Sequence, residues 1–123
     1  MKRVVAVIGA SADRRKFGNK AVRAFLHQGY DVRPVNPTVR TVEGLTAYSS
    51  ITDITDPIDL VTMYVPPAIG ERLLEGIAAK RPAELWVNPG ADSPSLLARA
   101  EALGLRPIVA CSIMGAGESP SDF

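Results

Sequence analysis

The stretch between residues 9 and 16 contains the residues best suited to bind an anion. Gly9, Ala10 and Ser11 follow a short apolar run, and Arg14 and Lys16 come shortly after them. A turn of small residues that leads into a helix presents backbone N–H groups and the positive end of the helix dipole to an anion. The stretch therefore predicts a phosphate-binding turn, and the alternative is a plain loop with exposed basic side chains.

The distribution of charge supports the same interpretation. Residues 1–40 contain nine Lys or Arg and two Asp, a balance of +7, whereas the other 83 residues have a balance of −6. This asymmetry indicates either a positive field at one end of the fold, which would attract an anionic ligand, or scattered solvated faces. With a pI of about 7.9 and no basic patch interleaved with aromatic residues, the chain lacks the usual features of a nucleic-acid-binding protein.

Groups that could perform catalysis are few. Cys111 is the only cysteine and His27 the only histidine, so the chain forms no internal disulfide and has few ligands for a metal. A reactive cysteine needs a base or a positive dipole nearby, and we expect Cys111 to be a buried residue at a strand end. We expect His27 to stabilise a helix terminus, and Met63, Tyr64 and Trp86 to belong to the core. The prediction is no catalytic residue and no metal site.

The anion-binding turn belongs to a pattern in which strands and helices alternate. Five short apolar segments predict strands, and helical spacing of apolar residues between them predicts helices. Gly29 and Gly104 are typical of positions just after a helix, and Ser93 before Pro94 is a typical N-cap. The predicted strands span residues 4–8, 31–35, 59–65, 84–87 and 106–110, and the predicted helices span 17–28, 68–80 and 94–103.

Two segments have weak periodicity. Residues 38–57 predict a long connection with a short helical turn near 50–54, and residues from about 115 to 123 predict a loose tail. The remaining alternation of strands and helices indicates a parallel sheet with right-handed crossovers. We expect a single α/β domain over residues 1–123, a Rossmann-like three-layer fold with a mainly parallel five-stranded sheet and helices on both faces.

No segment predicts association with a membrane. No apolar run approaches the roughly 18 to 20 residues of a membrane-spanning helix. Residues 1–12 are similar to a signal peptide in having basic and small residues, but the apolar part is only five residues long, against the roughly 7 to 15 of a signal peptide. A strand explains this run better, and we expect a cytoplasmic protein.

The ligand site of an open parallel sheet lies beyond the carboxyl ends of its strands. Four of the five junctions at these ends consist of small, rigid residues without titratable groups, which suit binding better than proton transfer. The candidate ligand-binding residues at and near these junctions are Gly9, Ala10, Ser11, Arg14, Lys16, Asn36, Pro37, Val65, Pro66, Asn88, Pro89 and Gly90.

The first junction does not match the two best-known nucleotide motifs. In the dinucleotide fingerprint G-x-G-x-x-G, Ser11 and Arg14 stand where the second and third glycines belong, and Asn36 stands where an NAD site has Asp or Glu. The Gly-Lys-Ser/Thr ending of a P-loop is also absent. The sequence therefore favours another nucleotide or phosphate ligand.

Four segments together are similar to a known family. They resemble the small CoA-binding domain family, which is related to the CoA-binding N-terminal domain of succinyl-CoA synthetase α subunits. The resemblance spans about residues 4–114. The segments that carry it are Val-Ile-Gly-Ala-Ser at 7–11, Gly-Tyr-Asp-Val followed by Pro-Val-Asn-Pro within 29–37, Asp-Leu-Val leading to Val-Pro within 59–66, and Cys-Ser-Ile-Met at 111–114.

The resemblance implies a Rossmann-like domain that holds coenzyme A at the carboxyl edge of its sheet. It places the turn from Gly9 through Ser11 against the phosphates of the coenzyme, and Asn36 with Pro37 beside the nucleotide. Val65 and Pro66 would pack on the adenosine or pantetheine portion. Arg40 would contact a phosphate, although many relatives have Lys shortly after the Asn-Pro pair and this sequence has Thr-Val-Arg.

The sequence thus predicts a non-catalytic protein that binds CoA or acyl-CoA as its ligand. One alternative is a CoA-binding subunit of a multi-chain acyl-CoA enzyme, and another is a nucleotide sensor of the NAD(H) type. The expected partners are the coenzyme and either a second copy of the chain, in a homodimer, or an unidentified protein. Nucleic acids and membranes are not expected partners.

Overall fold

The computed structural model describes residues 2–123, and its centre is a sheet built from short runs of β-branched residues. The five strands are all parallel and are arranged in the order β2-β1-β5-β6-β7. This sheet confirms the predicted fold class. The strands are β1 (Val4–Ile8), β2 (Asp31–Val35), β5 (Leu60–Met63), β6 (Glu84–Val87) and β7 (Pro107–Val109).

Three longer helices connect these strands, with the predicted caps. The Ser93 hydroxyl accepts a hydrogen bond from the backbone N–H of Leu96 (3.0 Å) at the start of the third helix. Gly29 and Gly104 follow helix ends with φ of +85° and +83°, a conformation that glycine adopts without strain. The helices are α1 (Phe17–His27), α2 (Pro67–Ala79), α3 (Pro94–Ala102) and the short α4 (Ser112–Gly115).

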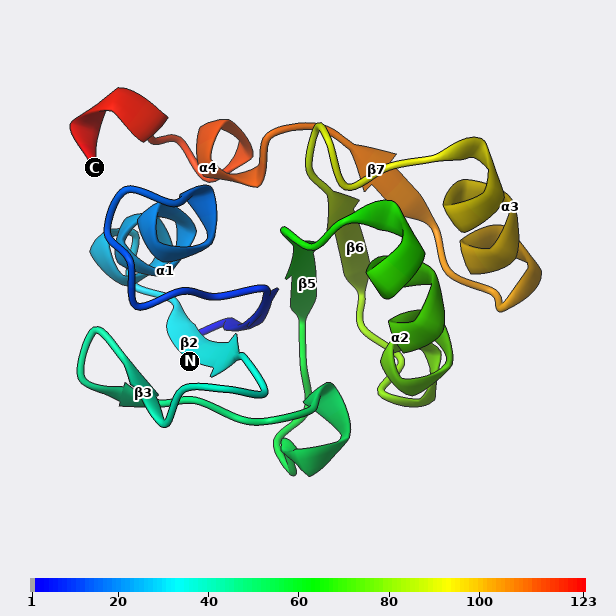
Figure 1. Cartoon of the computed structure of the whole chain (residues 1–123), viewed down its shortest axis with the longest axis horizontal. Coiled ribbons are helices and arrows are strands. Elements are labelled where there is room, and N and C mark those ends of the chain that lie inside the picture. The colour runs from blue at the N-terminus through cyan, green and yellow to red at the C-terminus, as the bar shows by residue number, and fades with distance from the viewer. Residues whose placement is uncertain (1) are drawn as a thin grey trace.

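The two faces of the sheet have separate cores because side chains alternate along each strand. Val5 and Val7 of β1 pack with Phe25 of α1, whereas Ala6 and Ile8 belong to the core that contains residues of α2 and α3. In Figure 1, α1 and α4 lie on one side of the sheet, and α2 and α3 on the other. The result is the predicted three-layer arrangement.

The connection between β2 and β5 is more ordered than predicted. It contains an antiparallel hairpin of β3 (Thr41–Val42) and β4 (Leu45–Thr46). The two residues of its turn, Glu43 and Gly44, both have positive φ (49° and 78°), as a tight two-residue hairpin turn requires. The 3-10 helix η1 (Ile51–Asp53) confirms the predicted helical turn.

The prediction of a loose C-terminal tail is wrong. The chain forms α4 and the 3-10 helix η2 (Pro120–Asp122) and returns to α1. The Glu118 carboxylate lies 2.9 Å from Nδ1 of His27, the last residue of α1, and the Phe123 ring centroid lies 5.8 Å from the Arg23 guanidinium. These contacts are single side-chain pairs between distant segments, so they leave no periodicity in the sequence.

The strand order places a switch point between β1 and β5. The chain leaves β1 toward β2 on one side and later returns to β5 on the other side. In doubly wound sheets, ligands bind outside the carboxyl ends of the strands at such a point. Within residues 2–123, no helix has the length and apolar character needed to cross a bilayer.

Candidate functional site

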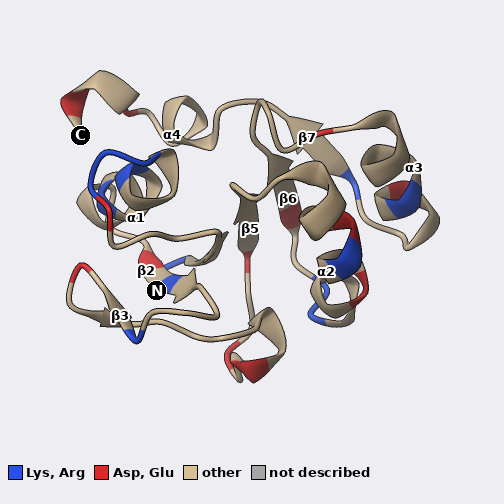
Figure 2. Cartoon of the chain, in the orientation of Figure 1, with Lys and Arg blue, Asp and Glu red and all other residues tan. Residues whose placement is uncertain are grey.

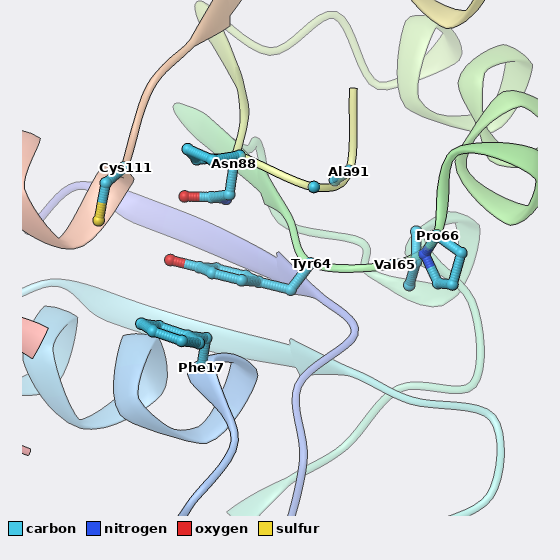
Figure 3. Close-up of a pocket in the computed structure, with 9 residues that line it drawn as sticks. Phe17, Tyr64, Val65, Pro66, Asn88, Ala91 and Cys111 are labelled. Atoms are coloured by element: carbon cyan, nitrogen blue, oxygen red, sulfur yellow. The ribbon is translucent and has the colours of Figure 1, made fainter. Parts of the chain in front are cut away.

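A pocket of about 560 Å³ lies at the carboxyl ends of the strands. Its wall is built from the residues that follow β5, β6 and β7 and from the first residue of α1, and Figure 3 shows these side chains converging on one space. The pocket therefore lies where the topology predicts a ligand. The lining residues are Phe17, Tyr64, Val65, Pro66, Asn88, Pro89, Gly90, Ala91 and Cys111.

A buried hydrogen-bond network supports the pocket wall at Asn88. Its Nδ2 donates to Thr62 Oγ1 (2.7 Å) and to the backbone carbonyl of Met63 (2.8 Å). Its Oδ1 accepts hydrogen bonds from the backbone N–H and the hydroxyl of Ser112, at 2.9 and 3.1 Å. Asn88 thus joins the ends of β5 and β6 to the start of α4, and fixes the relative positions of three pocket-forming segments.

Tyr64 is not the core residue that the sequence predicts. It is half-buried, lines the pocket, and its hydroxyl lies 2.9 Å from Ser112 Oγ. Because Ser112 donates its hydroxyl proton to Asn88, the Tyr64 hydroxyl is the donor in this bond and keeps lone pairs that can accept. Burial raises the pKa of Tyr64 to about 12, so the phenol stays protonated and neutral at physiological pH.

Met63 and Trp86 are the two other residues predicted to belong to the core, and only Met63 is fully buried. Met63 is completely buried, which confirms that prediction. Trp86 is half-buried, and its indole N–H donates to the Glu84 carboxylate (2.8 Å). Gly115 of α4 packs directly against the Trp86 ring, because a Cβ at this position would lie 2.5 Å from it.

Cys111 also differs from its prediction. It is half-buried rather than buried, and it lines the pocket. The reason is that β7 already ends at Val109, so Cys111 is not a residue of the sheet. It precedes α4 as its N-cap residue. Figure 3 shows its sulfur and the Tyr64 hydroxyl at the same end of the pocket.

The turn after β1 is held against the start of α1 by a pair of glycines. Gly9 has φ of +86°, and a Cβ on Gly18 would lie 2.1 Å from the Gly9 carbonyl oxygen. Only glycine at position 18 allows this approach. Gly18 therefore provides the close helix–strand packing that the third glycine of a dinucleotide fingerprint provides. It lies four residues after position 14, where that fingerprint has its third glycine.

Asn19 fixes the same turn from inside. Its side chain is completely buried, with Nδ2 donating to the Ser11 carbonyl (2.9 Å) and Oδ1 accepting from Arg23 Nε (2.7 Å). The Ser11 hydroxyl accepts a hydrogen bond from the backbone N–H of Asp13 (3.0 Å), which leaves its proton available to a ligand. Hydrogen bonds from the side chain and from the backbone N–H of Arg15 lower the pKa of the Asp13 carboxyl to about 2.

The predicted basic residues lie on the surface of the loop that leads into α1, where Figure 2 shows a concentration of Lys and Arg. Arg14 and Lys16 are both exposed. Arg14 Nε lies 3.5 Å from Glu43 Oε2, a solvent-exposed ion pair of little energetic value. Lys16 is the N-cap residue of α1, and its side chain makes no capping hydrogen bond. Arg40 is exposed as well, beyond the end of β2.

Asn36 uses its side chain to join two loops. Its Nδ2 donates to the Ala10 carbonyl (2.8 Å), and its Oδ1 accepts from the backbone N–H of Thr38 (2.7 Å). The amide is thus engaged within the protein. These hydrogen bonds bring the turn after β1 next to the turn after β2. Pro37, in the turn after β2, is exposed.

The predicted site residues therefore form two adjoining groups. One group, around Gly9, lies at the ends of β1 and β2, and the other lines the pocket at the ends of β5 and β6. The groups are in contact, because a Cβ on Gly9 would lie 3.0 Å from Val65 Cγ1 and from the backbone of Tyr64. Four lining residues were not among the predicted site residues: Phe17, Tyr64, Ala91 and Cys111. Of these, Ala91 and Cys111 could have been found from their positions just after strands, whereas the sequence has no signal for the other two.

The pocket wall offers little for acid–base or metal chemistry. Its nine residues include no carboxylate and no histidine. Across residues 2–123, no three His, Cys, Asp or Glu side chains lie close enough to hold a metal ion. What the wall presents is apolar surface, backbone groups, one neutral phenol and one thiol.

Comparisons with known proteins show the family of this chain. A family model described as a CoA binding domain matches residues 3–117. The chain is 33% identical over 75 residues to the uncharacterized protein YneT of Bacillus subtilis, covering 58% of this chain and 56% of that protein. It is 40% identical over 65 residues to the ADP-forming acetate–CoA ligase II subunit alpha of Pyrococcus furiosus, covering 52% of this chain and 14% of that one. The chain thus spans little more than half of the first relative and a small part of the second.

Solved structures show the same fold. A conserved hypothetical protein from Pyrococcus furiosus has a TM-score of 0.83 at 27% identity, covering 94% of this chain and 99% of that one. The apo dinucleotide-forming acetyl-coenzyme A synthetase 1 of Ca. Korarchaeum cryptofilum has a TM-score of 0.73 at 25% identity, covering 85% of this chain and 25% of that one. The family match extends over most of the sequence and includes both groups of site residues, and the chain belongs to the CoA-binding domain family.

Proposed function

We propose that this protein binds CoA or acyl-CoA along the carboxyl edge of its sheet and has no catalytic groups of its own. The observation that carries the proposal is the position of the pocket. It begins beside the Gly9 turn at the switch point and continues across the ends of β5, β6 and β7. A long, narrow ligand with phosphates at one end fits this layout.

The layout also gives the ligand a direction. Adjacent strands lie about 4.8 Å apart, and β7 is the third strand from β1 in the sheet, so Cys111 lies on the order of 14 Å from the Gly9 turn. The pantetheine arm contains three amide-length units, each at least about as long as the ~3.4 Å of an extended residue. With the pyrophosphate at Gly9, the arm covers at least about 10 Å of this path in the direction of Cys111, and the adenosine lies on the side of Asn36 and Pro37.

The phosphate end of this arrangement has donors and charge. The N-terminus of α1 has no side-chain cap, so its first backbone N–H groups are available to an anion. Arg14 and Lys16 are exposed next to it. The turn of Gly9, Ala10 and Ser11 would contact the phosphates, and Arg40 lies beyond β2, where it would serve a phosphate on the adenosine side.

The pantetheine end has the opposite character. Phe17, Val65, Pro66 and Ala91 provide an apolar wall without charge, which suits the uncharged arm of the coenzyme. Because the phenol of Tyr64 stays protonated, it acts as a hydrogen-bonding group and not as a base. These features support binding without chemistry.

The test is a calorimetric titration of CoA into the wild-type protein, the double variant Arg14→Ala/Lys16→Ala and the control Arg106→Ala. Arg106 is exposed and lies just before β7, at the opposite edge of the sheet. Loss of two charge-assisted contacts should weaken binding by about tenfold or more, and the control should bind as the wild type does. No binding of CoA at millimolar concentration, or tight binding of NAD(H) instead, overturns the proposal.

A second candidate function is that of a CoA-binding subunit whose partner chain supplies the catalytic residues. The observation that favours it is the similarity to ADP-forming acetate–CoA ligases, of which this chain covers 11% to 14%. A partner of this kind should be recovered in a pull-down from native extract. Recovery of the chain only as a monomer or homodimer argues against it.

A further inference from the structure

We propose that the bound coenzyme forms a mixed disulfide with Cys111, so that the pocket captures oxidised CoA covalently. This inference rests on the proposed function. It adds a modification site and a second state of the complex, in which the ligand is held by a bond as well as by contacts.

Two independent observations point to this pocket as a ligand site. One is the cavity itself, about 560 Å³ in size and open at the strand ends, and the other is the family match over residues 3–117. The ligand in the description of the family, CoA, ends in a thiol. The strand order places Cys111 at the far end of the path from the Gly9 turn, which is the end toward which the pantetheine arm extends.

The surroundings of Cys111 favour a partner from outside the chain. It is the only cysteine, so no disulfide within the protein competes for its sulfur. It is half-buried and lines the pocket, so a ligand sulfur can reach it through the cavity. Phe17 and Ala91 of the same wall hold the arm of the coenzyme against the apolar surface beside it.

The reaction is a thiol–disulfide exchange with CoA disulfide as the oxidant. The Cys111 thiolate attacks the sulfur of the bound half, the sulfur–sulfur bond of the CoA disulfide breaks, and a new bond forms between Cys111 and that half. The other half leaves as a thiolate and takes up a proton. Cys111 is oxidised, one CoA is reduced, and no further reactant is needed.

The physical advantage is proximity. Binding through the nucleotide places the disulfide next to Cys111 and replaces a bimolecular step by one within the complex. A disulfide without the nucleotide, such as oxidised glutathione, lacks this advantage. Release of the captured coenzyme then depends on a reducing thiol, so the lifetime of the complex responds to the redox state of its surroundings.

The experiment is intact-mass spectrometry of the reduced protein after incubation with CoA disulfide. We expect one CoA per chain, removed by dithiothreitol, and formed at least about tenfold faster than the adduct with oxidised glutathione at equal concentration. Excess desulfo-CoA, which occupies the site but has no sulfur, should slow the reaction. Cys111→Ser and Cys111→Ala should form no adduct and should bind desulfo-CoA with unchanged affinity in calorimetry.

The outcomes separate this inference from the proposed function. If desulfo-CoA binds but CoA disulfide reacts no faster than oxidised glutathione, or if desulfo-CoA gives no protection, the covalent capture is refuted and the binding function stands. If neither CoA nor desulfo-CoA binds, the proposed function itself fails. The protection experiment uses the wild-type protein and stays decisive if a cysteine variant does not fold.

Discussion

Replacement of Gly18 by alanine should destabilise the protein and weaken its binding of coenzyme together. A Cβ at this position would lie 2.1 Å from the Gly9 carbonyl oxygen, where ordinary van der Waals contacts of a Cβ are 3.4–4 Å. The start of α1 would have to move by more than about 1 Å, because the atom in the way is backbone and has no rotamer to change. Overpacking of this kind costs about 1–3 kcal/mol, against a gain of at most about 1 kcal/mol from replacing a helical glycine.

A net loss of about 1–2 kcal/mol lowers the melting temperature of a domain of this size by about 4–8 °C. The control is Gly76→Ala. That glycine also lies in a helix, and its new Cβ would meet only side-chain methyl groups, Thr52 Cγ2 at 3.3 Å and Ile51 Cγ2 at 3.6 Å. This variant should melt within a few degrees of the wild type, or above it.

Differential scanning calorimetry measures both variants, and titration with CoA measures binding at a temperature where each is folded. Gly18→Ala should bind CoA at least about tenfold more weakly, because the start of α1 is displaced from the Gly9 turn and its N–H groups no longer converge with that turn on the proposed anion site. Gly76→Ala should bind normally. If Gly18→Ala melts and binds as the wild type does, then the glycine contact does not position the anion site and the reasoning is refuted.

Two further predictions concern the buried network and the C-terminal segment. Asn88→Ala removes the acceptor of the Ser112 N–H and the donor to Thr62, so the free energy of unfolding in urea should fall by about 2–4 kcal/mol; an unchanged value would show that the network is not stabilising. The hydrogen bond from His27, with a second from Gln28, lowers the pKa of Glu118 below its ordinary value of 4.5. Its contribution to stability is therefore present above pH 4.5 and lost as the pH falls through the lower pKa of the folded state. Glu118→Gln should be less stable than the wild type at neutral pH and equally stable in strong acid, and a difference that persists in acid would contradict this assignment.

The elements that determine the position of the site could be predicted from sequence because each has a local signal. The apolar run at Val4–Ile8, the N-cap at Ser93 and the glycine stops at Gly29 and Gly104 require only neighbouring residues. Once the strands alternate with helices, topology brings their carboxyl ends to one edge of the sheet. For this reason Val65 and Asn88, which lie at the carboxyl ends of two predicted strands, are found in one pocket.

The features that could not be predicted depend on contacts between distant residues. Phe17 enters the pocket wall only because Gly18 allows α1 to approach Gly9 so closely, and no local pattern marks that contact. Cys111 was expected to be buried at a strand end because a strand was predicted to run to residue 110, whereas β7 ends at Val109 and leaves Cys111 half-buried at the pocket. The tail is ordered by Glu118 and Phe123, each paired with residues of α1 that lie far away in sequence.

The way this chain departs from the dinucleotide fingerprint also accounts for the class of ligand it suits. Because Gly18 provides the close packing that position 14 would provide in that fingerprint, the loop before α1 is longer and has room for basic residues, of which Arg14 and Lys16 are exposed beside the proposed anion site. At the end of β2, Asn36 replaces the carboxylate that would bind the ribose hydroxyls of NAD. A carboxylate there would repel a phosphate on the ribose, whereas the amide is neutral and engaged with Ala10. Both changes favour a coenzyme with more phosphate charge than NAD, and coenzyme A, with a 3′-phosphate in addition to its pyrophosphate, meets that requirement.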